Sequence, residues 1–266
     1  SLKRKENDFD YVANNQLKSV LFKGTTLENS AAGTIESISK IELKDIENFI
    51  SQTVCLENLI IVAGGDFELK EFEKLVKPLL ETLNVGKKAQ LEEVNFISKK
   101  EEKVLIKDTQ QAYIYFGSSF NINSKDEENY KAKVASFILG GSGFGSRLME
   151  EIRVKRGLAY SAYGSISINK SHSYFNGYLQ TKNETADEAK KLVGEIIEDF
   201  VKNGVTNDEL SAAKNFLTGS EPLRSETLSQ RLNRAFTLYY RGLEPNYSQK
   251  ELEKIQNLEL TDLNNY

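Results

Sequence analysis

The spacing of apolar side chains divides the chain into helix-like and strand-like stretches. Apolar residues recur at three- and four-residue intervals over many segments, which predicts amphipathic helices. We expect helices at residues 2–22, 43–54, 68–83, 126–139, 146–156, 185–202, 207–219, 227–240 and 249–256. Pro78 should break or kink the third of them. In the helix at 126–139, the inward positions are Tyr130, Val134, Phe137 and Ile138.

Strands are predicted where apolar residues run continuously or alternate with polar ones. Residues 58–64 are a short apolar run, which indicates a strand buried on both faces, and residues 111–120 form a second strand. Residues 158–168 alternate, with Tyr160, Ala162, Gly164 and Ile166 on one face. Residues 173–181 alternate as well, and the short polar connection at 169–171 predicts a hairpin between the two.

Two parts of the sequence are similar to each other. Residues 38–49 match residues 255–266 at an offset of 217, and residues 22–24 match 240–242 at an offset of 218. We interpret this as a duplicated, domain-sized unit. Residues 1–85 would end a first, truncated repeat, residues 86–102 would be a linker, and residues 103–266 a second repeat truncated at its C-terminus. The expected class is α+β, with a mixed or antiparallel sheet packed by helices.

The duplication also suggests what each copy lacks. Residues 50–96 correspond to a piece that follows the second copy, and they could fill that place within one chain or between the two chains of a homodimer. The chain begins at Ser1 in a charged stretch without an apolar targeting segment, so we expect a fragment or a processed product.

Composition removes several classes of function. The 266 residues are 39% hydrophobic, but no run approaches the roughly 18 apolar residues of a membrane span. The net charge is −4 with both signs interspersed, so we expect no nucleic-acid partner. A soluble protein follows, with the cytoplasm slightly favoured over the periplasm. The single cysteine, Cys55, excludes a cysteine metal cluster, and the single histidine, His172, excludes both zinc motifs of the His-Glu-x-x-His and His-x-x-Glu-His types.

The glycine-rich stretch at 140–145 invites a nucleotide-binding interpretation, which its context opposes. Phosphate-binding loops follow a strand, whereas the residues before Gly140 have helical spacing, and no Gly-Lys-Ser/Thr follows. A turn between two helices is favoured. The adjacent Glu150 and Glu151 point about 100° apart on a helix and cannot face each other as a catalytic pair. Glu151 and Lys155 are spaced as an ordinary surface ion pair.

Arg153 and Tyr160 flank the predicted end of the helix at Gly157. On one side of a helix–strand junction, a fixed cation and a phenol donor could hold a polarised carbonyl oxygen. The alternative is structural: Arg153 pairs with Glu150, and Tyr160 packs on the sheet. Spacing alone favours this second interpretation.

A resemblance to a known family favours the carbonyl-holding interpretation of Arg153 and Tyr160. The stretch Leu139-Gly-Gly, Ser146-Arg-Leu, Glu151-Ile-Arg153 and Arg156-Gly-Leu-Ala-Tyr160-Ser is similar to the second-domain motif of the pitrilysin/insulinase family of inverted-motif zinc peptidases. Gln111-Ala-Tyr-Ile resembles the strand that opens that domain. Asn58-Leu-Ile-Ile-Val-Ala-Gly-Gly-Asp resembles the closing strand of the first domain, and Gly33-Thr-Ile-Glu-Ser-Ile the loop before it.

The resemblance implies two homologous α+β domains that close around a peptide. Zinc would be held in the first domain by His-x-x-Glu-His and a distal Glu, and Arg153 and Tyr160 would hold the substrate carbonyl and its oxyanion. Gly141, Gly143 and Phe144 would touch substrate. The zinc ligands would lie upstream of Ser1, so we expect zinc in the parent metalloendopeptidase but neither zinc nor cleavage in this fragment. Its partners would be a peptide and a metal-bearing domain or subunit. The other possibility is a non-catalytic relative that serves assembly or peptide binding.

Overall fold

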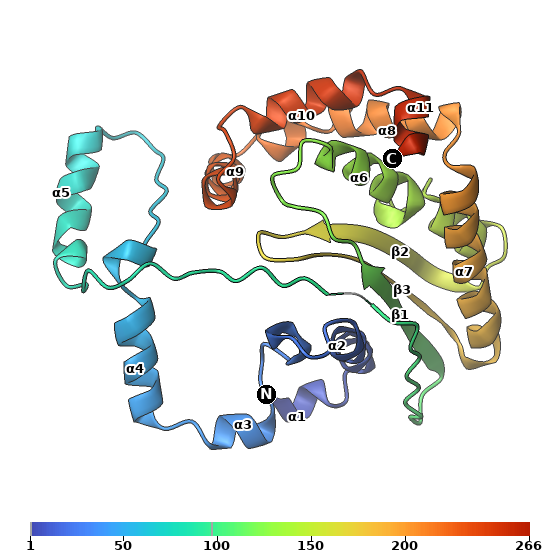
Figure 1. Ribbon diagram of the computed structural model, residues 1–266, viewed down its shortest axis with the longest axis horizontal. Helices are drawn as coiled ribbons and strands as arrows, with labels where there is room; N and C mark the ends of the chain where they lie inside the picture. The colour runs from blue at the N-terminus through green and yellow to red at the C-terminus, as the bar shows by residue number, and fades with distance from the viewer. Residues whose placement is uncertain (1, 97) are drawn as a thin grey trace. The chain divides into compact units, whose positions relative to one another are not determined.

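The computed structural model describes residues 2–96 and 98–266; residue 1 and residue 97, inside the predicted linker, lie outside the described residues. The described residues form helices and an antiparallel sheet, which confirms the α+β class (Figure 1). The helices are α1 (Leu2–Lys5), α2 (Phe9–Leu21), α3 (Ile35–Ser39), α4 (Leu43–Thr53), α5 (Leu69–Leu80), α6 (Asn129–Ser136), α7 (Ala186–Asn203), α8 (Asn207–Gly219), α9 (Leu228–Arg241), α10 (Tyr247–Gln256) and α11 (Leu260–Asn265). The strands are β1 (Gln111–Ser119), β2 (Ala159–Ile168) and β3 (Ser173–Lys182).

Contacts divide the chain into two compact units. The first takes in Ser1–Ala32, Glu93–Gly219 and Ser248–Tyr266, and the second Gly33–Glu92 and Ser220–Tyr247. These units group residues by contact, whereas the predicted boundaries at 85 and 103 describe a duplication along the sequence. The duplication remains a prediction. One observation supports it: α4 begins at Leu43 and α11 at Leu260, each after a glutamate N-cap and 217 residues apart.

The sheet belongs to the first unit and has the order β1-β3-β2 with antiparallel pairing throughout. The predicted hairpin between β2 and β3 is confirmed. Its turn is closed by the Asn169 backbone N–H, which donates to the His172 carbonyl at 2.9 Å. Along the outer edge of β2, the Ile166 N–H donates to the Ser136 hydroxyl of α6 at 3.0 Å, so this edge is covered rather than left open.

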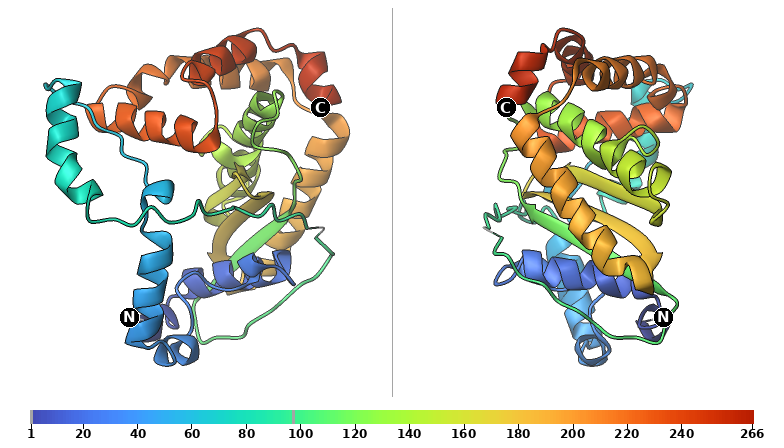
Figure 2. Two further views of the ribbon diagram at one scale, coloured as in Figure 1. Left: turned by 60° about the vertical axis from the view of Figure 1, so that its left-hand side comes forward. Right: turned by 90° about the vertical axis from the view of Figure 1, so that its right-hand side faces the viewer.

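The core lies between the sheet and the helices of the first unit. Helix α7 crosses one face of the sheet (Figure 2), where Leu179, Ala162 and the α7 residue Val193 are buried together. A second cluster joins α6, α8, α10 and α11. Val134 and Ile138 are buried in it and Tyr130 and Phe137 pack against it, as their helical spacing predicted.

Several element predictions need correction. The helix expected at 2–22 is two helices, because the Asp8 carboxylate accepts the Tyr11 N–H and starts α2 anew. Helix α5 runs through Pro78 and ends at Leu80. The proline does not break it. Helices α3 and α11 were not predicted.

The strand expected at residues 58–64 is wrong. Residues 59–64 are extended but form no strand among the described residues, and Leu59 and Ile61 are exposed. A strand buried on both faces needs partner strands for its backbone groups, and the described residues supply none. Helices α4 and α5 of the same unit have amphipathic sequences but no buried residues.

None of the helices in the described part of the chain is both long enough and apolar enough to cross a membrane.

Candidate functional site

A buried serine fixes the end of the glycine-rich loop. The Ser146 hydroxyl donates to the Gly143 carbonyl at 2.7 Å and accepts the Met149 N–H at 3.4 Å. Leu148, Met149 and Ile152 of the following helix are almost fully buried. The buried side chains of this helix therefore fix the position of the loop that precedes it.

The C-terminal end of the same helix is held by an unusual set of backbone bonds. It contains a π-helical turn, η4 (Met149–Val154), in which the Lys155 N–H donates to the Glu150 carbonyl at 2.9 Å. Gly157 then adopts a φ of +64°, and its N–H donates to the Arg153 carbonyl at 2.9 Å. This confirms Gly157 as the helix stop. Arg153 thus lies in a π turn, a feature frequent at functional sites.

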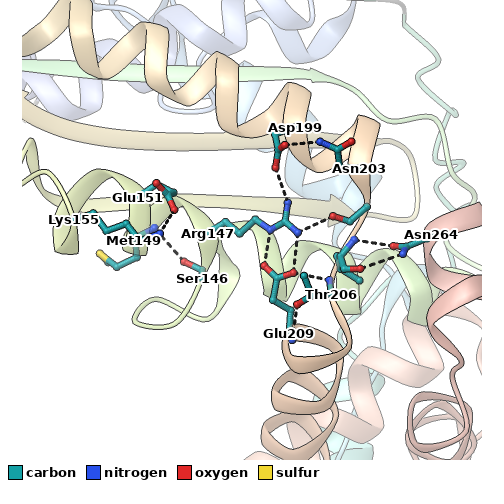
Figure 3. Close-up of polar contacts among 12 residues, drawn as sticks. Ser146, Arg147, Met149, Glu151, Lys155, Asp199, Asn203, Thr206, Glu209 and Asn264 are labelled. Atoms are coloured by element: carbon teal, nitrogen blue, oxygen red, sulfur yellow. Dashed lines mark hydrogen bonds and ion pairs between the residues drawn. The ribbon is translucent and has the colours of Figure 1, made fainter.

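Arg147 ties this helix to the corner between α7 and α8 (Figure 3). Its Nε and Nη2 atoms donate to the two carboxylate oxygens of Glu209 at 2.5 and 2.8 Å, and Nη2 also donates to the Gly204 carbonyl at 2.7 Å. Burial raises the pKa of Glu209, but hydrogen bonds from Arg147 and Thr206 outweigh it and leave the pKa below its usual value. Arg147 therefore has a positioning role that the sequence did not suggest.

Arg153 and Phe144, two of the predicted site residues, lie together. The Arg153 guanidinium carbon is 4.8 Å from the centroid of the Phe144 ring, a cation–π contact. Among the described residues, the Arg153 side chain forms no ion pair, so the expected pairing with Glu150 is not formed. Glu151 is bound instead by Lys155 and Arg156. The Phe144 ring is 68% exposed.

Tyr160 points to the opposite face from the one predicted. The pairing of β2 with β3 shifts between Ala159, opposite Thr181, and Ser161, opposite Gln180, so Tyr160 is the extra residue of a β-bulge. Ala159 and Ala162 are both buried, and Tyr160 is 71% exposed. The structural alternative, in which Tyr160 packs on the sheet, is therefore wrong. Within the described part of the chain, its phenol has no hydrogen-bond partner and no contact that joins it to Arg153.

The glycines of the loop are required by close approach and by backbone angle. A Cβ on Gly141 would lie 3.1 Å from the Ser136 carbonyl oxygen, and Gly143 has a φ of +71°. The loop joins the π-helical turn η3 (Phe137–Gly141) to the next helix, which confirms a turn between helices. A Cβ on Gly143 would be 3.9 Å from the ring of Tyr163, so the loop lies against the sheet at that point.

Tyr163 belongs to a row of tyrosines that the sequence analysis did not recognise. Tyr115, Tyr178 and Tyr163 lie opposite one another on β1, β3 and β2. Their ring centroids are 5.4 and 5.8 Å apart, with interplanar angles of 24° and 19°. Alternation along one strand does not reveal such a row, because only the register of the three strands aligns these side chains.

The residues present do not fit a zinc ion. No group of three or more His, Cys, Asp or Glu side chains in the described residues is arranged to hold a metal. His172 borders a polar pocket of about 220 Å³, and its ring nitrogens lie 2.8 Å from the Ser171 hydroxyl and 3.3 Å from the Asn169 amide. Burial lowers the pKa of His172. Its stacking on Tyr174 and contact with Phe22 give it a packing role.

Comparison with known proteins identifies the family of the chain. Residues 40–217 match the family profile described as the peptidase M16 inactive domain. The chain belongs to the M16 peptidase family. This confirms the resemblance to the pitrilysin/insulinase peptidases.

Individual M16 relatives differ in the activity that their names record. The chain is 44% identical, over all 266 residues, to the "non-peptidase homolog YmxG" of Helicobacter pylori, and covers 61% of that protein. It is 25% identical over 223 residues to an uncharacterized zinc protease of Streptomyces coelicolor, with 80% of this chain and 48% of that protein covered. The chain therefore spans about half to three-fifths of these relatives.

A solved M16 structure has the same fold. The crystal structure of the peptidase M16 inactive domain from Pseudomonas fluorescens superposes with a TM-score of 0.90, over 99% of this chain and 62% of that one, at 24% identity.

Proposed function

We propose that this chain is the peptide-binding half of a two-domain M16 protein, in which Arg153 and Tyr160 hold the backbone carbonyl of a bound peptide. The observation that supports this is the state of Arg153. A permanent cation lies on an exposed aromatic ring, at the end of a helix locked by Gly157, without an ion-pair partner among the described residues.

The chemistry of these groups suits a carbonyl oxygen. Arginine carries several N–H donors and stays charged at all working pH values, and the Tyr160 phenol is a neutral donor with no partner in the described structure. Donors placed at a carbonyl oxygen contribute most when negative charge develops on that oxygen. The metal, where the family uses one, supplies an activated water; the described residues offer no place for it. The proposed partner is therefore a metal-bearing domain or subunit.

A second candidate is favoured by one comparison. The H. pylori relative is named a non-peptidase homolog. In this version the same surface binds a peptide, or a segment of a partner subunit or of a second copy, without hydrolysis. The two candidates share the residues and differ in turnover.

Full-length protein separates the candidates. Elemental analysis would measure zinc, quenched fluorescent peptides would report cleavage, and fluorescence polarisation of labelled peptides would report binding. The variants are Arg153→Ala and Tyr160→Phe. Matched controls are Arg156→Ala, an exposed arginine that binds Glu151 from the turn after the same helix, and Tyr239→Phe, a tyrosine elsewhere in the chain that is 70% exposed.

For the peptidase version, we expect chelator-sensitive cleavage that Arg153→Ala lowers by roughly 100- to 1,000-fold, as for the loss of one oxyanion donor. For the non-catalytic version, we expect no cleavage, with binding about 10- to 100-fold weaker in Arg153→Ala, as for a hydrogen bond to a charged group. If Arg153→Ala behaves like Arg156→Ala in both assays, the proposed function is wrong.

A further inference from the structure

The tyrosine row lies near the glycine-rich loop that carries Phe144, the ring under Arg153. Tyr115, Tyr178 and Tyr163 run from β1 to β2, and a Cβ on Gly143 would lie 3.9 Å from the edge of the Tyr163 ring. Phe144 follows directly along the chain, and Arg153 lies on its ring. The loop residues Gly143 and Phe144 therefore connect the β2 end of the tyrosine row to Arg153.

The row lies on the face of the sheet away from α7. The neighbouring residues Ile114 and Leu179 point to the core between the sheet and α7, so Tyr115 and Tyr178 point the other way. Helix α2 covers the β1 end of this face: the Tyr115 phenol donates to Asp10 at 2.9 Å, and Leu17 lies 3.5 Å from the Cβ position of Gly117. At the β2 end Tyr163 remains 41% exposed.

Hydroxyl contacts hold two of the three tyrosine rings, those of Tyr115 and Tyr178. Burial and the bond to Asp10 raise the pKa of Tyr115, so its phenol stays protonated as a donor. The Tyr178 hydroxyl lies 3.0 Å from that of Ser161. Tyr163 stacks on Tyr178, one of these two held rings, so the exposed end of the row is partly pre-organised and a further ring can be added at a small cost in entropy.

We infer that the exposed end of this row takes an aromatic side chain of the bound peptide, with an acidic residue beside it facing Arg153. An aromatic ring laid on Tyr163 would continue the row at the same offset-stacked spacing, which aromatic pairs favour. The carboxylate complements the guanidinium, which has no anionic partner among the described residues. This inference rests on the proposed function, because it specifies the peptide that the same site selects.

The test uses full-length protein and four labelled peptides. Fluorescein-Gly-Ala-Ala-Phe-Glu-Ala-Ala is compared with versions that carry Leu for Phe, Gln for Glu, or both, by fluorescence polarisation. We expect the Leu version to bind about 2- to 10-fold more weakly, the range for one aromatic pair, and the Gln version about 10-fold more weakly.

Variants assign each preference to its residue. Tyr163→Leu should remove the preference for Phe over Leu, Tyr163→Phe should keep it, and Arg153→Ala should remove the preference for Glu over Gln. Tyr239→Leu, at an exposed tyrosine outside the row, should change neither. Far-UV circular dichroism confirms that each variant is folded.

Two failures can be told apart. If Tyr163→Leu still prefers Phe as strongly as the parent, or if the four peptides bind alike, the inference about the tyrosine row is wrong. A loss of binding in Arg153→Ala would then still leave the proposed function intact. If Arg153→Ala binds every peptide as the parent does, the proposed function fails as well.

Discussion

Replacement of Arg147 by methionine tests whether the helix that carries Arg153 depends on its tie to α8. The guanidinium makes two bonds to Glu209 and one to the Gly204 carbonyl, and the exposed fractions of the Arg147 and Glu209 side chains are 16% and 24%. Removal of one partner of a buried ion pair costs about 3–5 kcal/mol. In the variant, the Glu209 carboxylate still accepts the Thr206 N–H at 2.8 Å and can be partly hydrated. We therefore expect a loss of unfolding free energy at the lower end of this range, about 3 kcal/mol.

The loss should appear as a lower urea midpoint, followed by circular dichroism at the helix band because the chain has no tryptophan. Lys155→Ala is the control: it removes an exposed ion pair with Glu151, which is worth about 0.5 kcal/mol or less. The double variant Arg147→Met/Glu209→Gln should lose at least about 1 kcal/mol less than the sum of the single losses, because it leaves no largely buried charge unpaired; Asp199, the other carboxylate bound by Arg147, is 58% exposed. If Arg147→Met unfolds at the same urea concentration as Lys155→Ala, the tie does not hold the helix.

Two further predictions concern backbone approach and pH. Gly140→Ala should lower stability by about 1–3 kcal/mol, since its Cβ would lie 2.4 Å from the Gly164 backbone nitrogen. Gly194→Ala, in open space on α7, should instead raise stability by up to about 1 kcal/mol. Urea unfolding measures both changes, and equal effects would contradict the packing described. Burial lowers the pKa of His172, so below the unfolded value of about 6.5 the unfolded chain binds more protons and stability falls as the pH drops. His172→Gln should flatten the fall in urea midpoint between about pH 7 and pH 5, and an unchanged slope would refute this assignment.

Periodicity predicted correctly those elements whose apolar residues are buried by other segments of the described chain. The hairpin at 159–182 and the inward face of α6 are examples: their apolar residues meet α7 and α8 as the spacing requires. The strand at 58–64 fails for the opposite reason. Apolar composition indicates that a segment needs burial, but a strand also needs hydrogen-bonded partners, and the described residues hold none for it.

The candidate site was predictable only in part. Arg153 and Phe144 came from a motif, and the structure shows them in contact. Arg147 was missed because its partners, Asp199 and Glu209, are 52 and 62 residues away in the sequence. The tyrosine row depends on the register of three strands, which alternation within any one strand does not determine.

Two local irregularities decide where the predicted site residues point. Strict alternation would place Tyr160 on the same face as Ala162, which is buried; one extra residue in β2 turns the phenol outward instead. On the other side of Gly157, the π turn inserts an i→i−5 bond at Lys155, which changes the rotation of the helix just after Arg153. A regular strand would place Ala159 and Ala162 on opposite faces, whereas the bulge allows both to be buried in the core and leaves Tyr160 exposed. The same irregularity therefore completes the core and turns the phenol outward, which is the orientation that the proposed role of Tyr160 requires.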